Sequence, residues 1–290
     1  MKVVFKNFLC IALFLLSINQ VHASSVNSSL YIIGDSLQTV NAGKMPYFTF
    51  NKTNSFSQKN AIIELNVGDS LNLWIHNTDS IDHIFDIKGV VGINRIVPSG
   101  DSVNIIHQFN TAGLYIYYDS LNFPVYSYLG LAGSIVVKDN NHSSFFWNTK
   151  EHQSSWNESL ATGGSVLWND YQPDFFTING LSHPDIITDP QINIVGNVGD
   201  TILVYIANTG RGMRSIHFHG YHAEIKYSSK YPSHIGRSKD TFPIHSMETV
   251  VLQIVPDKPG EYPVHEHNLI AVTGNSFYPN GMFSITNIQP

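Results

Sequence analysis

Four histidines in the second half of the chain form two His-x-His pairs. His217 and His219 lie in "RSIHFHG", and His265 and His267 lie in "YPVHEHN". Both stretches contain β-branched or aromatic residues, so we expect strands, in which residues i and i+2 project from the same face. Two such pairs on neighbouring strands would bring four imidazoles toward one metal ion or a close pair of ions.

Imidazole suits copper, zinc, iron and nickel, and copper(II) binds such sites most tightly among the divalent ions. The alternative is that these imidazoles only form hydrogen bonds across a subunit contact. The same alternation turns Glu266, which separates His265 from His267, toward the opposite face of its strand. An acid there requires an explanation, because that face would normally be apolar.

An internal repeat organises the chain. The tetrapeptide Asn-Val-Gly-Asp occurs at Asn66–Asp69 and again at Asn197–Asp200, and similar sequence surrounds both copies. Each unit consists of short runs rich in Val, Ile, Tyr and Phe, separated by Gly-Asp and Pro-x-Gly turns. We therefore predict an all-β protein with two consecutive sandwiches of about a hundred residues each, over 30–139 and 175–288, joined by a linker over 140–174.

Residues 1–23 have the pattern of a secretory signal peptide: two early lysines, a short apolar run and Val21-x-Ala23 before the cleavage point. We therefore expect a periplasmic or secreted protein. The apolar run is too short to span a membrane, and no later segment could do so. Cys10, the only cysteine, lies in this segment, so the exported chain would have no disulfide and no thiolate ligand.

The charge of the chain argues against nucleic acid as a partner. Its formal net charge is −6, and cleavage of the signal peptide would remove Lys2 and Lys6 and make it −8. Such a surface repels phosphate rather than attracting it.

The histidine stretches resemble those of two-domain cupredoxins of the multicopper oxidase and copper nitrite reductase superfamily. The last domain of the oxidases carries His-x-x-His-x-His-Gly, then His-Cys-His, then a late Gly-Met. This chain has "RSIHFHG", "HEH" and "NGM" in that order. The resemblance implies two cupredoxin-like Greek-key β-sandwiches, with His217, His219, His265 and His267 as copper ligands.

The chain departs from the family at the blue (type 1) copper site of the second domain. Glu266 stands in place of the cysteine, Arg214 in place of the first histidine and Ala271 in place of the later one. Without cysteine no blue copper site can form. Glu266 and Arg214 should both point inward, and we predict a bidentate ion pair between them, with a contact under about 3.2 Å, in place of copper.

The first domain resembles the nitrite reductases at "HIFDIK", residues 83–88. Their His-x-x-Asp-x-His pattern supplies a blue-copper ligand, a catalytic aspartate and a type 2 copper ligand; His83 and Asp86 match, and Lys88 replaces the last histidine. The remaining ligand positions are taken by Tyr118, Asp119, Tyr126 and Leu131. The resemblance therefore implies that this domain lacks its copper ligands. We expect His83 and Asp86 to form a structural hydrogen-bonded pair.

Other histidines are assigned smaller roles. His222 matches a catalytic histidine beside the reductases' copper and could relay protons, as could Asp86. His234 and His245 are near these residues in sequence, but histidines are common in loops. Four more histidines are expected at the surface or in turns: His76, His107, His142 and His152.

The expected function is that of an exported copper protein with one copper ion, or a close pair, held by the second domain. It would perform redox chemistry on a small molecule with an external electron donor. The alternative is a non-enzymatic protein that stores or transfers copper, or a structural oligomer. Absence of a type 1 site removes the internal electron relay, which counts against a multi-electron oxidase. The resemblance also implies a homotrimer.

Overall fold

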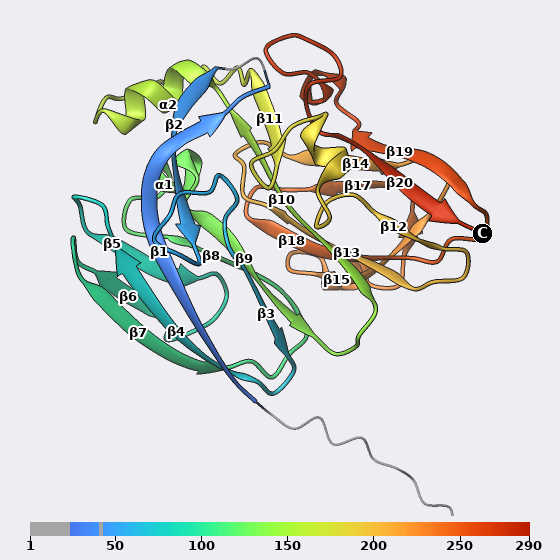
Figure 1. Ribbon diagram of the computed structural model, residues 1–290, viewed down its shortest axis with the longest axis horizontal. Helices are drawn as coiled ribbons and strands as arrows, with labels where there is room; N and C mark the ends of the chain where they lie inside the picture. The colour runs from blue at the N-terminus through green and yellow to red at the C-terminus, as the bar shows by residue number, and fades with distance from the viewer. Residues whose placement is uncertain (1–23, 41–42) are drawn as a thin grey trace, which may run out of the picture.

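A computed structural model describes residues 24–40 and 43–290 as two β-sandwiches (Figure 1). The signal peptide expected over 1–23 lies outside these described residues. No helix in the described part of the chain has the length and hydropathy needed to cross a membrane.

The first sandwich consists of a four-stranded sheet in the order β2-β1-β4-β7 and a five-stranded sheet in the order β3-β9-β8-β5-β6. Its elements are β1 (Ser25–Gln38), β2 (Lys44–Asn51), β3 (Ile62–Asn66), β4 (Ser70–Asn77), β5 (His83–Ile87), β6 (Asn94–Val97), β7 (Ser102–Gln108), β8 (Gly113–Asp119), α1 (Val125–Leu129) and β9 (Ala132–Lys138).

The second sandwich consists of a six-stranded sheet in the order β11-β10-β13-β18-β15-β16 and a five-stranded sheet in the order β12-β20-β19-β14-β17. Its elements are β10 (Ser143–His152), α2 (Ser154–Ala161), β11 (Phe175–Ile178), β12 (Val195–Asn197), β13 (Ile202–Asn208), β14 (Arg214–Phe218), β15 (Ala223–Ser228), β16 (Ser238–Lys239), β17 (Thr241–Ile244), β18 (Glu248–Ile254), β19 (Gly260–Glu266) and β20 (Phe283–Gln289). Three short 3₁₀ turns, η1 (Asp185–Thr188), η2 (Pro232–His234) and η3 (Leu269–Val272), complete it.

The repeated tetrapeptide occupies equivalent places in the two sandwiches. The amide of Asn66 donates to Asp69 Oδ2 at 2.8 Å, and the amide of Asn197 donates to Asp200 Oδ2 at 2.7 Å. The glycine between them has a positive φ in both copies, 92° and 86°, a conformation that glycine adopts at little cost. The strand before each turn, β3 or β12, pairs in parallel with the last strand of its sandwich, β9 or β20.

Three apolar layers lie between the four sheets. One fills each sandwich, and the third lies between β8 and β9 of the first sandwich and β10, β13 and β18 of the second. The middle layer includes Ile116, Val136, Leu203, Tyr205 and Val251. The two central sheets are therefore buried on both faces, and all seven residues of β13 are buried.

The structure differs from the linker expected over residues 140–174. β10 lies within this range and pairs with β13 in parallel and with β11 antiparallel, so it is a strand of the second sandwich. Phe145 and Trp147 pack into the core of that sandwich, whereas Phe146 packs into the layer between the sandwiches. Because both faces are buried, the strand shows no alternation of polar and apolar residues.

Candidate metal centre

The two His-x-His pairs lie on adjacent strands of the outermost sheet. β14 and β19 are antiparallel, and His217 lies directly opposite His265 in their register. Ile216 and Phe218 of β14 are buried in the core, and the histidines project from the other face. The strand alternation expected from the sequence therefore places all four imidazoles on one face of the sheet.

Two of the imidazoles approach each other with their nitrogen atoms. His219 Nε2 lies 3.0 Å from His265 Nε2. Two nitrogens bound to one ion at about 2.0–2.1 Å, at angles between a right angle and the tetrahedral angle, lie roughly 2.9–3.4 Å apart. The 3.0 Å separation is that of a hydrogen bond between the two imidazoles, and it also lies within the range expected for two ligands of one ion.

The other two imidazoles surround this pair. The ring of His217 lies 4.6 Å from that of His219, 5.7 Å from that of His265 and 5.4 Å from that of His267, between ring centres. In the described part of the chain, no three His, Cys, Asp or Glu side chains are already arranged around one ion. Side chains of His217 and His267 would have to rotate to join the pair.

Neighbouring groups set the hydrogen bonding and the protonation of two of these imidazoles. His265 Nδ1 donates a hydrogen bond of 2.8 Å to the backbone oxygen of Glu266, so the acceptor nitrogen of this ring is Nε2, which faces His219. Burial lowers the pKa of His219, and the charges of His217 and His265 lower it further. The neutral form of His219, which is the form that binds metals, is therefore favoured.

Two nearby residues were missed from the sequence. Thr241 lies opposite His217 in the β14–β17 register, and its hydroxyl is 2.8 Å from His217 Nδ1. The hydroxyl of Thr241 lowers the pKa of Asp240, as do the charges of His217 and His222. Asp240 and His222 thus lie beside the histidine face. Finding Thr241 would have required the pairing of β14 with β17, two strands that are separated in the chain by β15 and β16.

Asp86, the other candidate for proton relay, does not approach these histidines within one chain. It lies on β5, whereas His217 and His265 lie on β14 and β19 at the opposite side of the molecule (Figure 1). Its carboxylate accepts a hydrogen bond of 3.0 Å from the side-chain amide of Asn94.

Arg214 and Glu266 both point inward, as expected, but the predicted bidentate contact is wrong. The nearest approach is 3.8 Å, from Arg214 Nε to Glu266 Oε2. A second carboxylate lies on the other side of the guanidinium, where Arg214 Nη2 is 3.5 Å from Glu151 Oε2. Backbone amides hold both acids: Ser215 N donates to Glu266 at 2.8 Å, and Gly212 N donates to Glu151 at 2.5 Å. Arg214 therefore lies between two carboxylates instead of pairing with one.

The first sandwich contains a buried ion pair at the equivalent position. Phe85 of β5 faces Asp119 of β8, as Ile216 of β14 faces Glu266 of β19. His83, two residues before Phe85, donates to Asp119 Oδ2 at 2.7 Å and to Asp79 Oδ2 at 3.1 Å. The expected His83–Asp86 pair is therefore wrong: residues three apart on a strand face opposite sides.

The two aspartates beside the buried His83 favour its protonated form. Burial alone would lower its pKa, but the hydrogen bonds and charges of Asp119 and Asp79 outweigh this effect, so the pKa is raised. Hydrogen bonds from His83 likewise hold the pKa of both aspartates below the usual value despite burial. Each sandwich thus contains a cation and two acids at this position.

Other expected positions are mostly at or near the surface. His142 is exposed, and His76 and His107 are partly exposed. His234 stacks on Tyr231 and His245 is tilted against the same ring, in the region of β15. His152 was expected at the surface, and this is wrong, because it is fully buried at the end of β10. Burial lowers its pKa to about 3, with a further contribution from Lys150.

Comparisons with known proteins agree with this architecture. Residues 164–278 match the family model described as multicopper oxidase. A search of curated proteins found no significant match. A solved blue copper oxidase from Nitrosomonas europaea is similar in structure, with a TM-score of 0.77 and 20% identity, over 91% of this chain and 86% of that chain.

Two nitrite reductases are similar in the same way. The copper nitrite reductase of Nitrosomonas europaea has a TM-score of 0.70 and 14% identity, over 91% of this chain and 94% of its own. The copper-containing nitrite reductase of Thermus scotoductus has a TM-score of 0.72 and 16% identity, over 92% of this chain and 62% of its own. The chain therefore has the two-sandwich fold of these copper proteins, and its residues 164–278 match the multicopper oxidase family.

Proposed function

We propose that this protein is exported, binds copper on the histidine face of its second domain and performs redox chemistry on a small molecule. The observation that carries the proposal is the 3.0 Å separation of His219 Nε2 and His265 Nε2. His217 and His267 would complete the ligand set. Copper bound there would supply one-electron chemistry and an open position for a small ligand.

Protein groups around the face have distinct roles in this proposal. The Glu266 carbonyl orients His265, and the Thr241 hydroxyl orients His217. The pKa of Asp240 is lowered, so its carboxylate stays ionised beside the site. His222 is the residue that would relay the proton that the reaction consumes.

Electrons would have to come from an external donor. The positions equivalent to the blue copper of relatives hold Arg214 with Glu266 in the second domain and His83 with Asp119 in the first. Neither set can support an electron-transfer copper without a cysteine. This same observation favours a second candidate function, in which the protein binds copper for storage or transfer and does not turn over.

Assembly into an oligomer, a homotrimer by resemblance, is part of the proposal. The segment that follows His267 exposes more than half of the side chains of Leu269, Ile270, Phe277 and Tyr278. Apolar side chains gathered beside a half-formed site are typical of a surface covered by another subunit. A second copy could bring Asp86 to the histidines, which one chain does not do.

Copper titration followed by electron paramagnetic resonance tests the proposal. We expect one or two equivalents of copper per chain with nitrogen hyperfine structure. The double variant His265→Ala/His267→Ala should lose stoichiometric binding, whereas His142→Ala, an exposed histidine in another loop, should retain it. Undiminished binding by the double variant would refute the ligand assignment.

Turnover distinguishes the two candidate functions. The copper-loaded protein is supplied with a one-electron reductant and with oxygen or nitrite, and consumption of each is measured. A rate that vanishes in the double variant supports the enzyme. Full copper occupancy with no rate above that of free copper supports storage or transfer.

A further inference from the structure

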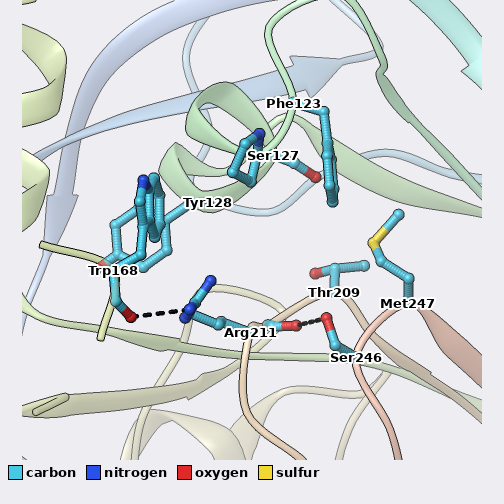
Figure 2. A pocket seen from close by; sticks show the side chains of 10 residues that line it. Phe123, Ser127, Tyr128, Trp168, Thr209, Arg211, Ser246 and Met247 are labelled. Carbon is cyan, nitrogen blue, oxygen red and sulfur yellow. Dashed lines mark hydrogen bonds between the residues drawn. The ribbon is translucent and has the colours of Figure 1, made fainter. Parts of the chain in front are cut away.

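A second candidate site lies where the two sandwiches meet, independent of the histidine face. Figure 2 shows a cavity of about 170 Å³ lined by residues from both domains. The first domain contributes the loop before α1 and α1 itself, and the second contributes the loops after α2, after β13 and before β18. Its lining residues are Phe123, Pro124, Ser127, Tyr128, Trp168, Thr209, Gly210, Arg211, Ser246 and Met247.

Most of the wall is apolar and aromatic. Trp168 packs edge-on against Tyr128, with ring centres 6.0 Å apart, and Phe123 and Met247 lie across the cavity from them. Phe123 remains about half exposed, which is uncommon for so large an apolar side chain unless it contacts something else. The cavity therefore favours an occupant with a flat apolar surface.

One hydroxyl in the wall has no hydrogen-bond partner. Ser127 is 3% exposed, and no described residue bonds to its Oγ. Its side chain points toward the cavity beside Phe123 (Figure 2). Buried polar groups are almost always satisfied, so an occupant with a polar atom at this point would remove an unfavourable feature of the empty protein.

The only cation that lines the cavity is Arg211, and no carboxylate of the described residues pairs with it. Its guanidinium lies 5.1 Å from the centre of the Trp168 ring, and Nη2 donates to the backbone oxygen of Trp168 at 2.9 Å. These contacts fix the plane of the guanidinium while its other N–H groups remain available. Such a fork matches a carboxylate.

The buried side chain of Lys150 lies next to two of the lining residues. Lys150 Nζ donates to the backbone oxygens of Ser127 at 2.6 Å and Thr209 at 2.8 Å, and both residues line the cavity. The lysine thereby occupies two carbonyl groups that would otherwise repel an anion. The polar side of the cavity is thus suited to a negative group.

We propose that this interdomain cavity binds a small aromatic carboxylate with a single ring. Its volume is close to the roughly 150 Å³ of an apolar cavity that accommodates benzene. The ring would lie between Phe123, Tyr128 and Trp168, and the carboxylate would lie at the Arg211 guanidinium.

Benzoate is the probe, and the methionine methyl groups report where it binds. Protein labelled with ¹³C at the methionine methyls is titrated with sodium benzoate and followed by NMR. The ring current should shift the Met247 signal, assigned with Met247→Leu, and leave those of Met45, Met213 and Met282 in place. No Met247 shift, or equal shifts at all methyls, would overturn the proposal.

Matched probes and variants test each part of the chemistry. Benzamide, which is flat but neutral, and acetate, which is charged but has no ring, should each bind at least about tenfold more weakly than benzoate. Arg211→Gln should lower benzoate affinity by a similar factor, as expected for loss of a charged hydrogen bond. Arg237→Gln, an exposed arginine elsewhere in the second domain, should have no effect. Equal affinity for benzamide and benzoate, or unchanged affinity in Arg211→Gln, would refute the anionic part.

Discussion

Arg214 should be essential for stability, whereas Glu266 should be replaceable by its neutral isostere. The guanidinium lies between Glu151 and Glu266, and all three side chains are buried. One positive charge thus faces two negative charges. The perturbations are Glu266→Gln and Arg214→Met, with Glu64→Gln as control, because Glu64 forms an ion pair with Lys138 at the surface.

The separations set the magnitudes. At 3.5–3.8 Å, each ion pair is worth about 4 kcal/mol at an effective dielectric constant of 20. Arg214→Met loses both attractions and leaves two buried carboxylates, so we expect a loss of at least about 3–5 kcal/mol. Glu266→Gln loses one attraction but also removes the desolvation of a charge and its repulsion by Glu151.

Glutamine also keeps the oxygen that accepts from Ser215 N and Asn268 N. We therefore expect Glu266→Gln to change the free energy of unfolding by no more than about 1 kcal/mol, as is typical when an acceptor is kept. Glu64→Gln should change it by less than about 1 kcal/mol, as for other exposed pairs.

The pH dependence gives a second test of the same argument. Burial raises the pKa of Glu266, and Glu151 raises it further, which outweighs the lowering by Arg214 and the two amides. Below the unfolded pKa of 4.5 the carboxyl is protonated in both states. As the pH rises from there through the folded pKa, unfolding releases a proton and becomes more favourable. Wild-type stability should therefore decline relative to Glu266→Gln across this window.

Urea unfolding, followed by tryptophan fluorescence at several pH values with a common m value, measures these differences. If Glu266→Gln is as damaging as Arg214→Met, or if its stability relative to the wild type does not rise with pH above 4.5, the shared-guanidinium interpretation fails.

Three further predictions follow from other buried groups and from composition. Burial lowers the pKa of Lys150 to about 7. The stability of the wild type relative to Lys150→Met should therefore rise between pH 7 and 10.5, by at most about 1.4 kcal/mol per pH unit. If urea unfolding shows the same stability difference between the two proteins across this range, the prediction is wrong. His83→Gln should lower the free energy of unfolding by roughly 3 kcal/mol or more below pH 6.5, and by less as the pH rises through the raised folded pKa of His83. The stabilising contribution of Asp79 and Asp119 is lost below pH 3.8. An equal loss of stability in His83→Gln at pH 6 and at pH 9 would be inconsistent with this reasoning. Because Cys10 is the only cysteine, copper-loaded mature protein should lack an intense thiolate band near roughly 600 nm, and an absorption spectrum showing that band would refute the ligand set.

The sequence alone determined which face each residue of the histidine strands occupies. Strand alternation is a local property, so two His-x-His pairs and the intervening Glu266 had only one arrangement once β14 and β19 were strands. The repeated Asn-Val-Gly-Asp likewise required two similar tight turns, because its glycine and aspartate act on the residues next to them. Hence the two sandwiches and the histidine face could be predicted.

Only the tertiary structure decided what meets those residues across the sandwich. Glu151 contacts Arg214 because β10 pairs in parallel with β13. This pairing places the end of β10, which carries Glu151, beside the loop that leads from β13 to Arg214. Nothing local to β10 indicated this pairing, since burial on both faces removes the alternation that marks a strand. The same central packing buries Lys150 and His152 and forms the interdomain cavity beside Arg211. These features depend on contacts between residues distant in sequence, which a local pattern does not encode.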